Sequence, residues 1–238
     1  MRDLWDKLID LYGTRKLTKD SDRLPALSGL AKRFRSWFKD EYVAGLWRRT
    51  LIGDLLWDSG RNPSIGWPPP EYRGPSWSWV AVNDIRSPMK RYQLCPKLAT
   101  LVHCHVQVKG KNPYGEVSDG WIALRAPILP ISVAEKPEKE KREAFHRFRT
   151  TNGDPKGSAT YLDYKMDETV LRELSLFVVI VGRDAANNAE ILFPGLVVTP
   201  AEGSDRYSRL GYILMNEKFL GGCTPDMGTT GYPTITLV

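Results

Sequence analysis

Two histidines that flank a cysteine, His103-Cys104-His105, are the residues whose types and spacing best suit chemistry. Alternate residues of a β-strand project to one face, so the two imidazoles would lie together and could offer two ligands to a zinc ion. A zinc site needs a third and usually a fourth donor, and the remaining histidine, His146, lies in a separate charged segment without a CxxC or HExxH motif. An ordinary pair of histidines on a sheet surface is therefore favoured over a metal centre, and Cys104 would point to the opposite face.

Other catalytic motifs are missing from the sequence. It contains no GxSxG, P-loop or GxGxxG pattern. Glu138 and Glu140 could pair as acid and base, but they lie in a lysine-rich stretch where solvent would hold their pKa values in the ordinary range. We therefore expect no catalytic residue, no cofactor and a function other than that of an enzyme.

Tryptophans offer a different kind of site, an aromatic surface for a ligand. The chain has eight, and those that fall within predicted helices are expected to pack in a core. Those on the β side could instead line a cleft. The candidate binding residues are Trp77, Trp79 and Trp121, and a ligand-binding β-domain that uses exposed tryptophans is the alternative function. A hydrolase or metalloenzyme centred on His103 and His105 is a further alternative that the sequence favours less.

Two of these tryptophans stand where helical patterns give way to β patterns. In Pro75-Ser76-Trp77-Ser78-Trp79 the alternation predicts a strand with both indoles on one face, and Pro75 fits the leading edge of that strand. The segment is expected to anchor the two parts of the chain to each other.

The first part is predicted to be helical. Apolar residues recur at helical spacing in three stretches, which predicts three short amphipathic helices at residues 4–12, 27–38 and 40–56. We assign residues 1–58 to this helical segment and residues 59–74 to a Pro/Gly-rich crossover.

Residues 75–238 form the predicted antiparallel β-rich domain, packed with the helices as one unit. Alternating or continuous apolar patterns predict strands at residues 97–108, 121–125, 159–164, 174–181, 191–198 and 210–216. The run 176–181 is the most apolar and should be a covered central strand. Because the connections are of turn length, the expected fold is α+β with mainly antiparallel pairing, as a sandwich or partly open barrel.

Composition sets limits on the surroundings of the chain. The net charge is +6, but basic and acidic residues are interleaved, which disfavours a nucleic-acid interface. No run approaches the roughly 18 apolar residues of a membrane span, and the start lacks an apolar signal region. Three widely spaced cysteines suit free thiols, so we expect a cytoplasmic protein without membrane contact.

Several stretches together resemble one family in order and spacing. They are LTKDSDRLPALSGLA (17–31), DEYVAGLW (40–47), LLW (55–57), YRGPSWSW (72–79) and NPYGEVSDGW (112–121). In these stretches the chain resembles the region that follows the HET domain in fungal heterokaryon-incompatibility (HET) domain proteins.

The resemblance implies a part in fungal self/non-self recognition, where full-length relatives trigger programmed cell death after incompatible strains fuse. The HET domain should precede Trp5, and its motifs are absent from this sequence. No catalytic residue is therefore carried over from the family. The expected function is that of an accessory or interaction module, with its own missing HET domain or another signalling protein as partner.

Overall fold

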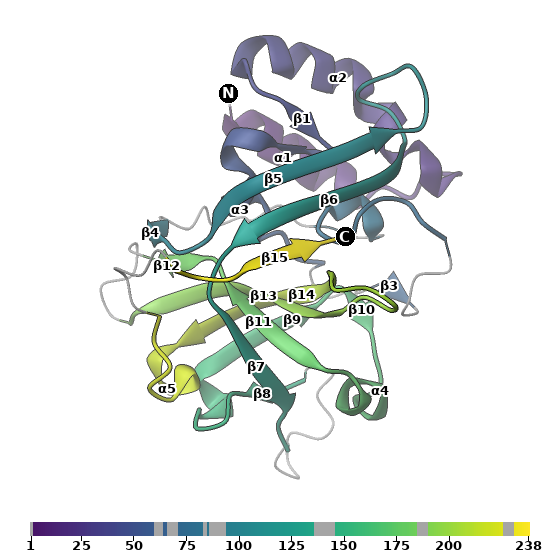
Figure 1. The fold of residues 1–238 in the computed structure, drawn as a ribbon. Helices are drawn as coiled ribbons and strands as arrows, with labels where there is room; N and C mark the ends of the chain where they lie inside the picture. Colours follow the sequence, from purple (N-terminus) through teal and green to yellow (C-terminus); the bar gives the residue numbers. More distant parts are fainter. Residues whose placement is uncertain are drawn as a thin grey trace.

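A computed structural model describes residues 2–59, 64–65, 71–82, 85, 94–135, 146–184, 190–225 and 231–238. The fold is α+β, as predicted: N-terminal helices lie over one end of a large, mostly antiparallel sheet that does not close (Figure 1). Of the predicted crossover at 59–74, residues 60–63 and 66–70 lie outside the described residues, as do Glu138 and Glu140.

The helices are short apart from the first two. The α-helices are α1 Arg2–Gly13, α2 Arg23–Phe38, α3 Leu51–Asp54, α4 Glu168–Glu173 and α5 Glu217–Leu220, and the 3-10 helices are η1 Asp20–Asp22, η2 Arg48–Thr50, η3 Trp79–Ala81 and η5 Pro155–Gly157. None of the helices in the described ranges combines the length and hydropathy that a membrane crossing requires.

The strands lie mostly after residue 93. They are β1 Tyr42–Val43, β2 Leu46–Trp47, β3 Ser64–Ile65, β4 Leu94–Lys97, β5 Thr100–Val108, β6 Val117–Arg125, β7 Ile128–Val133, β8 Phe148–Arg149, β9 Ser158–Leu162, β10 Tyr164–Lys165, β11 Leu176–Ile180, β12 Gly182–Asp184, β13 Leu192–Pro200, β14 Tyr207–Asn216 and β15 Thr234–Leu237.

Helices α1 and α2 follow the predicted amphipathic pattern. Trp5 and Ile9 of α1 are buried, and the indole of Trp5 meets the ring of Phe34 on α2 edge to face, with centroids 5.1 Å apart. Helix α2 ends where Lys39 turns into the left-handed region at φ 49° and donates its backbone N–H to the carbonyl of Arg35. The helix boundary thus comes from backbone conformation rather than from a glycine or proline.

The predicted helix at 40–56 is wrong. Strands β1 and β2 form a two-stranded antiparallel hairpin there, and only α3 is an α-helix. The turn between the strands places Ala44 at φ 44° and Gly45 at φ 95°, conformations that no right-handed helix contains. The apolar residues imitate helical spacing because both strands bury their side chains in the same core.

The large sheet has eleven strands in the described part of the chain. Its main path runs β5-β6-β15-β14-β13-β11-β7-β8, with β9 paired to β14 and β12 linking β13 to β4. Within this sheet only β14 and β15 pair in parallel. Strand β11 lies between β13 and β7, and its residues 178–180 are fully buried, which confirms the predicted central strand.

One hydrophobic core joins the two parts of the chain. It contains Trp5 and Leu27 from the helices together with Val179 and Leu237 from the sheet. The helical end is therefore fixed to the sheet by buried apolar surface, the largest favourable term in folding.

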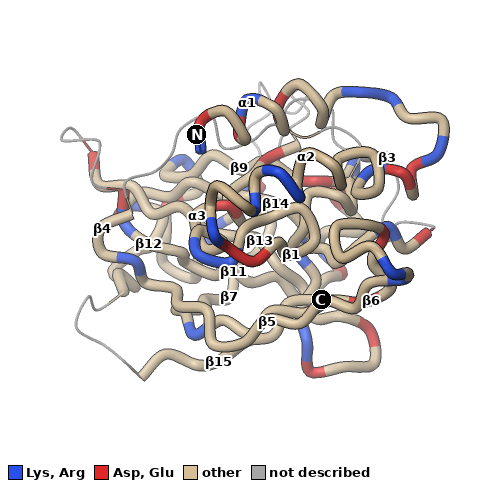
Figure 2. The backbone as a smooth tube through the Cα atoms, turned by 90° about the horizontal axis from the view of Figure 1, so that it is seen from above, with Lys and Arg blue, Asp and Glu red and all other residues tan. Residues whose placement is uncertain are grey.

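The charged residues follow no such division. Lys and Arg are interspersed with Asp and Glu along the described backbone (Figure 2).

Candidate functional site

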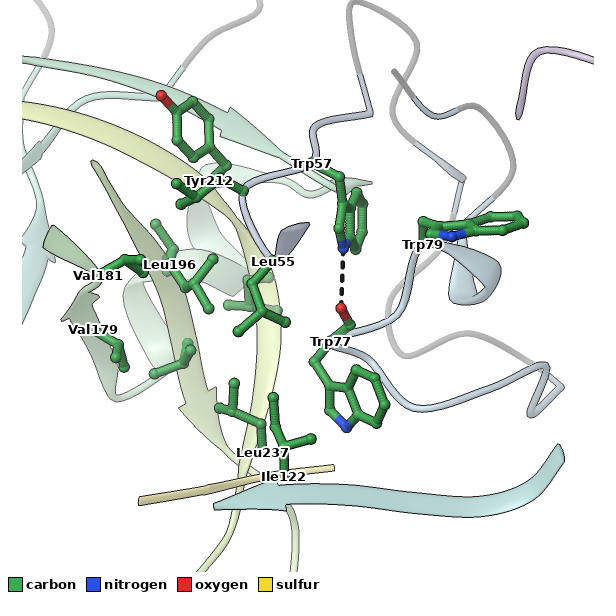
Figure 3. Close-up of a cluster of buried hydrophobic side chains, with 14 of the residues drawn as sticks. Leu55, Trp57, Trp77, Trp79, Ile122, Val179, Val181, Leu196, Tyr212 and Leu237 are labelled. Carbon is green, nitrogen blue, oxygen red and sulfur yellow. Dashed lines mark hydrogen bonds between the residues drawn. The ribbon is translucent and has the colours of Figure 1, made fainter. Parts of the chain in front are cut away.

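Trp77 and Trp79 do not lie on a strand, so that prediction is wrong. Residues 76–78 form a turn, and Trp79 begins η3, because the hydroxyl of Ser78 accepts the backbone N–H of Val80 and caps this 3-10 turn. The two indoles leave the segment in different directions, with Trp77 beside Ile122 and Leu237 (Figure 3).

Both side chains are also removed from solvent. Trp77 is 0% exposed and Trp79 1%, so the hypothesis that they form an exposed binding surface is wrong for these two residues. Their large rings pack in the core because burying an indole stabilises the fold far more than leaving it in water.

We call Trp57, Trp77, Ser78, Trp79 and the 44–45 turn the aromatic junction. Three hydrogen bonds cross it. The indole of Trp57 donates to the backbone carbonyl of Trp77 at 3.0 Å (Figure 3). The indole of Trp79 donates to the carbonyl of Gly45 at 3.0 Å, and the hydroxyl of Ser78 donates to the carbonyl of Ala44. Each bond joins the helical end to the segment that leads into the sheet. The junction is a positioning device for two chain segments.

A buried ion pair supports the same junction. Arg209 on β14 is fully buried, and its Nε donates to Asp163 Oδ2 at 2.8 Å while its guanidinium lies 3.4 Å above the centre of the Trp57 ring. It also donates to the carbonyls of Leu55 and Trp57. Burial raises the pKa of Asp163, and the neighbouring guanidinium acts in the opposite direction. Because its donors are directed at these partners, Arg209 stabilises the packing of β14 against residues 55–57 and Asp163.

The third predicted tryptophan and the histidines lie on the β5–β6 hairpin. Trp121 is partly buried, and His105, its cross-strand partner, stacks on it with ring centroids 5.9 Å apart. His103 and His105 are exposed, while Cys104 is partly buried against the core, so the predicted alternation holds here. Within the described residues, no group of three His, Cys, Asp or Glu side chains is placed to hold a metal ion.

A cleft lies between α2 and the β5–β6 hairpin, and we call it the cationic cleft. Its outer part has a volume of about 690 Å³ and is lined by Lys32, Arg35, Ser36, Lys39, Asp40, Glu41 and Tyr114. Its inner part has a volume of about 310 Å³, and Arg35, Glu41 and Tyr114 line both parts. Among the apolar residues of the inner part are Val43 and Ala44 of the hairpin turn region, and Val106, Val108 and Val117 of the β5–β6 pair.

The interior of the cleft is lined by one carboxylate, that of Glu41, and by one thiol, that of Cys104. Burial raises the pKa of this thiol to about 11, with Glu41 adding to the rise and Arg48 opposing it. The thiol is therefore protonated near neutral pH and is a poor nucleophile. The carboxylate of Glu41 is itself paired with Arg48, at 3.4 Å.

No family model, curated protein or solved structure matches this chain.

The sequence did not predict the cationic cleft, because its walls come from residues 32–44 and 104–117, which only the fold brings together. The one readable signal is the spacing of Lys32, Arg35 and Lys39, which places three cations on one face of a helix.

Proposed function

We propose that this chain is a non-catalytic accessory or interaction module of a HET-type fungal protein that acts in heterokaryon incompatibility. The proposal rests on the resemblance of its motifs to the region that follows the HET domain. It includes a cytoplasmic setting and a protein partner, either its own HET domain or another signalling protein.

The aromatic junction is the observation that carries this proposal. Residues 40–47, 55–57 and 72–79 are separate motifs in the sequence, and in the fold they bond to one another through Gly45, Trp57, Trp77 and Trp79. The motifs thus make up one packed unit whose parts depend on each other. This arrangement is expected if the resemblance extends to a shared fold.

Helices α1 and α2 carry exposed apolar side chains that a partner could contact. On α1, Leu4 is 54% exposed and Leu11 68%, and on α2, Leu30 is 42% exposed and Trp37 43%. Large apolar side chains left exposed on these two helices are candidates for contact with another protein.

A direct binding measurement tests the proposal. The purified chain would be titrated, by calorimetry, with the purified HET domain of a fungal protein whose own tail carries the same motifs. We expect saturable binding that is weakened by Leu4→Asp with Leu11→Asp and retained in the control Tyr161→Asp, which changes a residue 44% exposed on β9. A chain that binds no such domain would contradict a HET domain as its partner.

A further inference from the structure

We propose that the cationic cleft binds a small molecule that combines an anionic group with an apolar or aromatic body. The anion would be held by Lys32, Arg35 and Lys39, and the body would enter the inner part beside Tyr114. This inference concerns a ligand rather than a protein partner, so it is independent of the proposed function.

The three cations of the outer part form no ion pair with the described residues. They lie at positions i, i+3 and i+7 of α2 and its C-terminal end, and all three line the cleft. The two acids beside them are engaged. Asp40 accepts backbone N–H groups from Glu41 and Arg49, at 2.8 and 3.2 Å, and Glu41 pairs with Arg48. An anion entering the outer part therefore meets three cations that form no ion pair with the described residues, beside the carboxylates of Asp40 and Glu41, and the lining keeps a net positive charge.

The inner part is suited to an uncharged body. Val43 is 2% and Val117 4% exposed, and Tyr114 lies 8% exposed with its ring 5.7 Å from that of Tyr42. The thiol of Cys104 is neutral here. Apolar and aromatic residues next to a few polar and charged groups are the usual composition of a small-molecule site.

The backbone around the cleft adopts conformations that side chains rarely take. Lys39 at φ 49° and Ala44 at φ 44° are the two non-glycine residues with positive φ in the described chain, and both line the cleft. Lys39 takes this conformation because it ends α2, and Ala44 takes it because it lies in the turn between β1 and β2. At position 39, the conformation sets where the lysine side chain leaves the end of α2.

The size of the cleft favours a small molecule over a polymer. Volumes of about 310 and 690 Å³ match the range of small-molecule pockets. A nucleic-acid surface needs a longer track of phosphate contacts than three cations at one helix end provide. The site can neutralise one anionic group, which could be a phosphate, a sulfonate or a carboxylate.

The fluorescent probe 1-anilinonaphthalene-8-sulfonate, which joins a sulfonate to an aromatic body, tests the proposal on the full chain. We expect one saturable site whose dissociation constant rises roughly tenfold in Arg35→Gln, since a charge-assisted hydrogen bond is lost. The control Arg33→Gln changes an arginine on the same helix whose guanidinium lies over the Trp37 ring, 5.4 Å from its centre, and should leave the affinity unchanged. Equal affinity in both variants would overturn the proposal.

Competition against the probe identifies the anion. Adenosine monophosphate and benzoate would each be compared with the uncharged adenosine and benzyl alcohol. If the monophosphate displaces the probe more strongly than adenosine does, the site recognises a phosphate group. If benzoate displaces the probe more strongly than benzyl alcohol does, the site recognises a carboxylate. Displacement by the uncharged compounds to the same extent as by the anions would show that the cations do not hold the ligand.

Lys39→Gly separates loss of the site from loss of the fold. Glycine adopts positive φ without strain and is the preferred residue at a helix C-terminus. This variant should therefore melt at a higher temperature than the parent and still bind the probe more weakly. A variant that gains stability and keeps full affinity would remove Lys39 from the site.

Discussion

The indole nitrogen of Trp79 donates a hydrogen bond of 3.0 Å to the carbonyl of Gly45, which lies 34 residues earlier in the chain. The turn residue cannot be enlarged, because a Cβ at position 45 would stand 2.6 Å from that same nitrogen and the backbone there has φ 95°. The tight turn of one segment and the tryptophan of the other are therefore a matched pair.

Gly45→Ala should destabilise the protein strongly, by about 2 kcal/mol or more, through the clash with Trp79 and the strained φ. Gly53→Ala is the matched control, because a Cβ there meets no atom within 4 Å and the residue lies in α3. It should be neutral or stabilising by up to about 1 kcal/mol. Urea unfolding of both variants measures the difference, and equal midpoints would contradict this account.

Ser78→Ala should cost about 1–3 kcal/mol of the free energy of unfolding. The hydroxyl is fully buried, donates to the carbonyl of Ala44 and accepts the N–H of Val80, so its removal leaves two buried groups unpaired. Ser204→Ala removes a hydroxyl with a similar local pattern from an exposed turn and should change stability by less than about 0.5 kcal/mol. Thermal unfolding of the two variants in parallel provides the comparison.

Arg209→Met should destabilise the fold by about 3–5 kcal/mol, because Asp163 would remain buried without its partner. Adding Asp163→Leu should recover part of that loss, since the uncompensated charge is then gone. The corresponding single and double variants of the exposed pair of Arg172 and Glu168 should change the free energy of unfolding by less than about 0.5 kcal/mol. A double variant no more stable than Arg209→Met would show that other contacts of the guanidinium dominate.

Asp54 should make stability depend on pH. Burial raises its pKa from 3.8 to about 6, against the opposing effect of the Arg2 guanidinium with which it pairs. Because the folded state holds this proton more tightly than the unfolded state, the contribution of Asp54 to stability falls as pH rises from about 4 to 6.

Asp54→Asn should remove that fall. The free energy of unfolding of the parent minus that of the variant should decrease by roughly 2 kcal/mol between pH 4 and pH 7. Urea unfolding at several pH values measures it, and other titrating groups cancel in the difference. A difference that is constant with pH would contradict the raised pKa.

The sequence by itself determined the helices and strands whose apolar pattern repeats within a single element. The apolar stripes of α1 and α2 predict amphipathic helices, and the continuous apolar run at 176–181 predicts a buried strand, as the structure has them. The exposed alternation of His103 and His105 followed from period two along β5. In each case the pattern repeats within a single element.

Tertiary structure alone decided the rest. The stretch 40–56 has helical spacing but begins with the β1–β2 hairpin and keeps only the short helices η2 and α3. The hairpin forms because its turn is fixed by Ser78 and Trp79 from a distant segment. Trp77 and Trp79 alternate as in a strand but turn into the core instead, where burial of both indoles outweighs their β propensity. The cationic cleft exists only where α2 meets the β5–β6 hairpin. Long-range packing, which no local pattern encodes, therefore set both the aromatic junction and the candidate site.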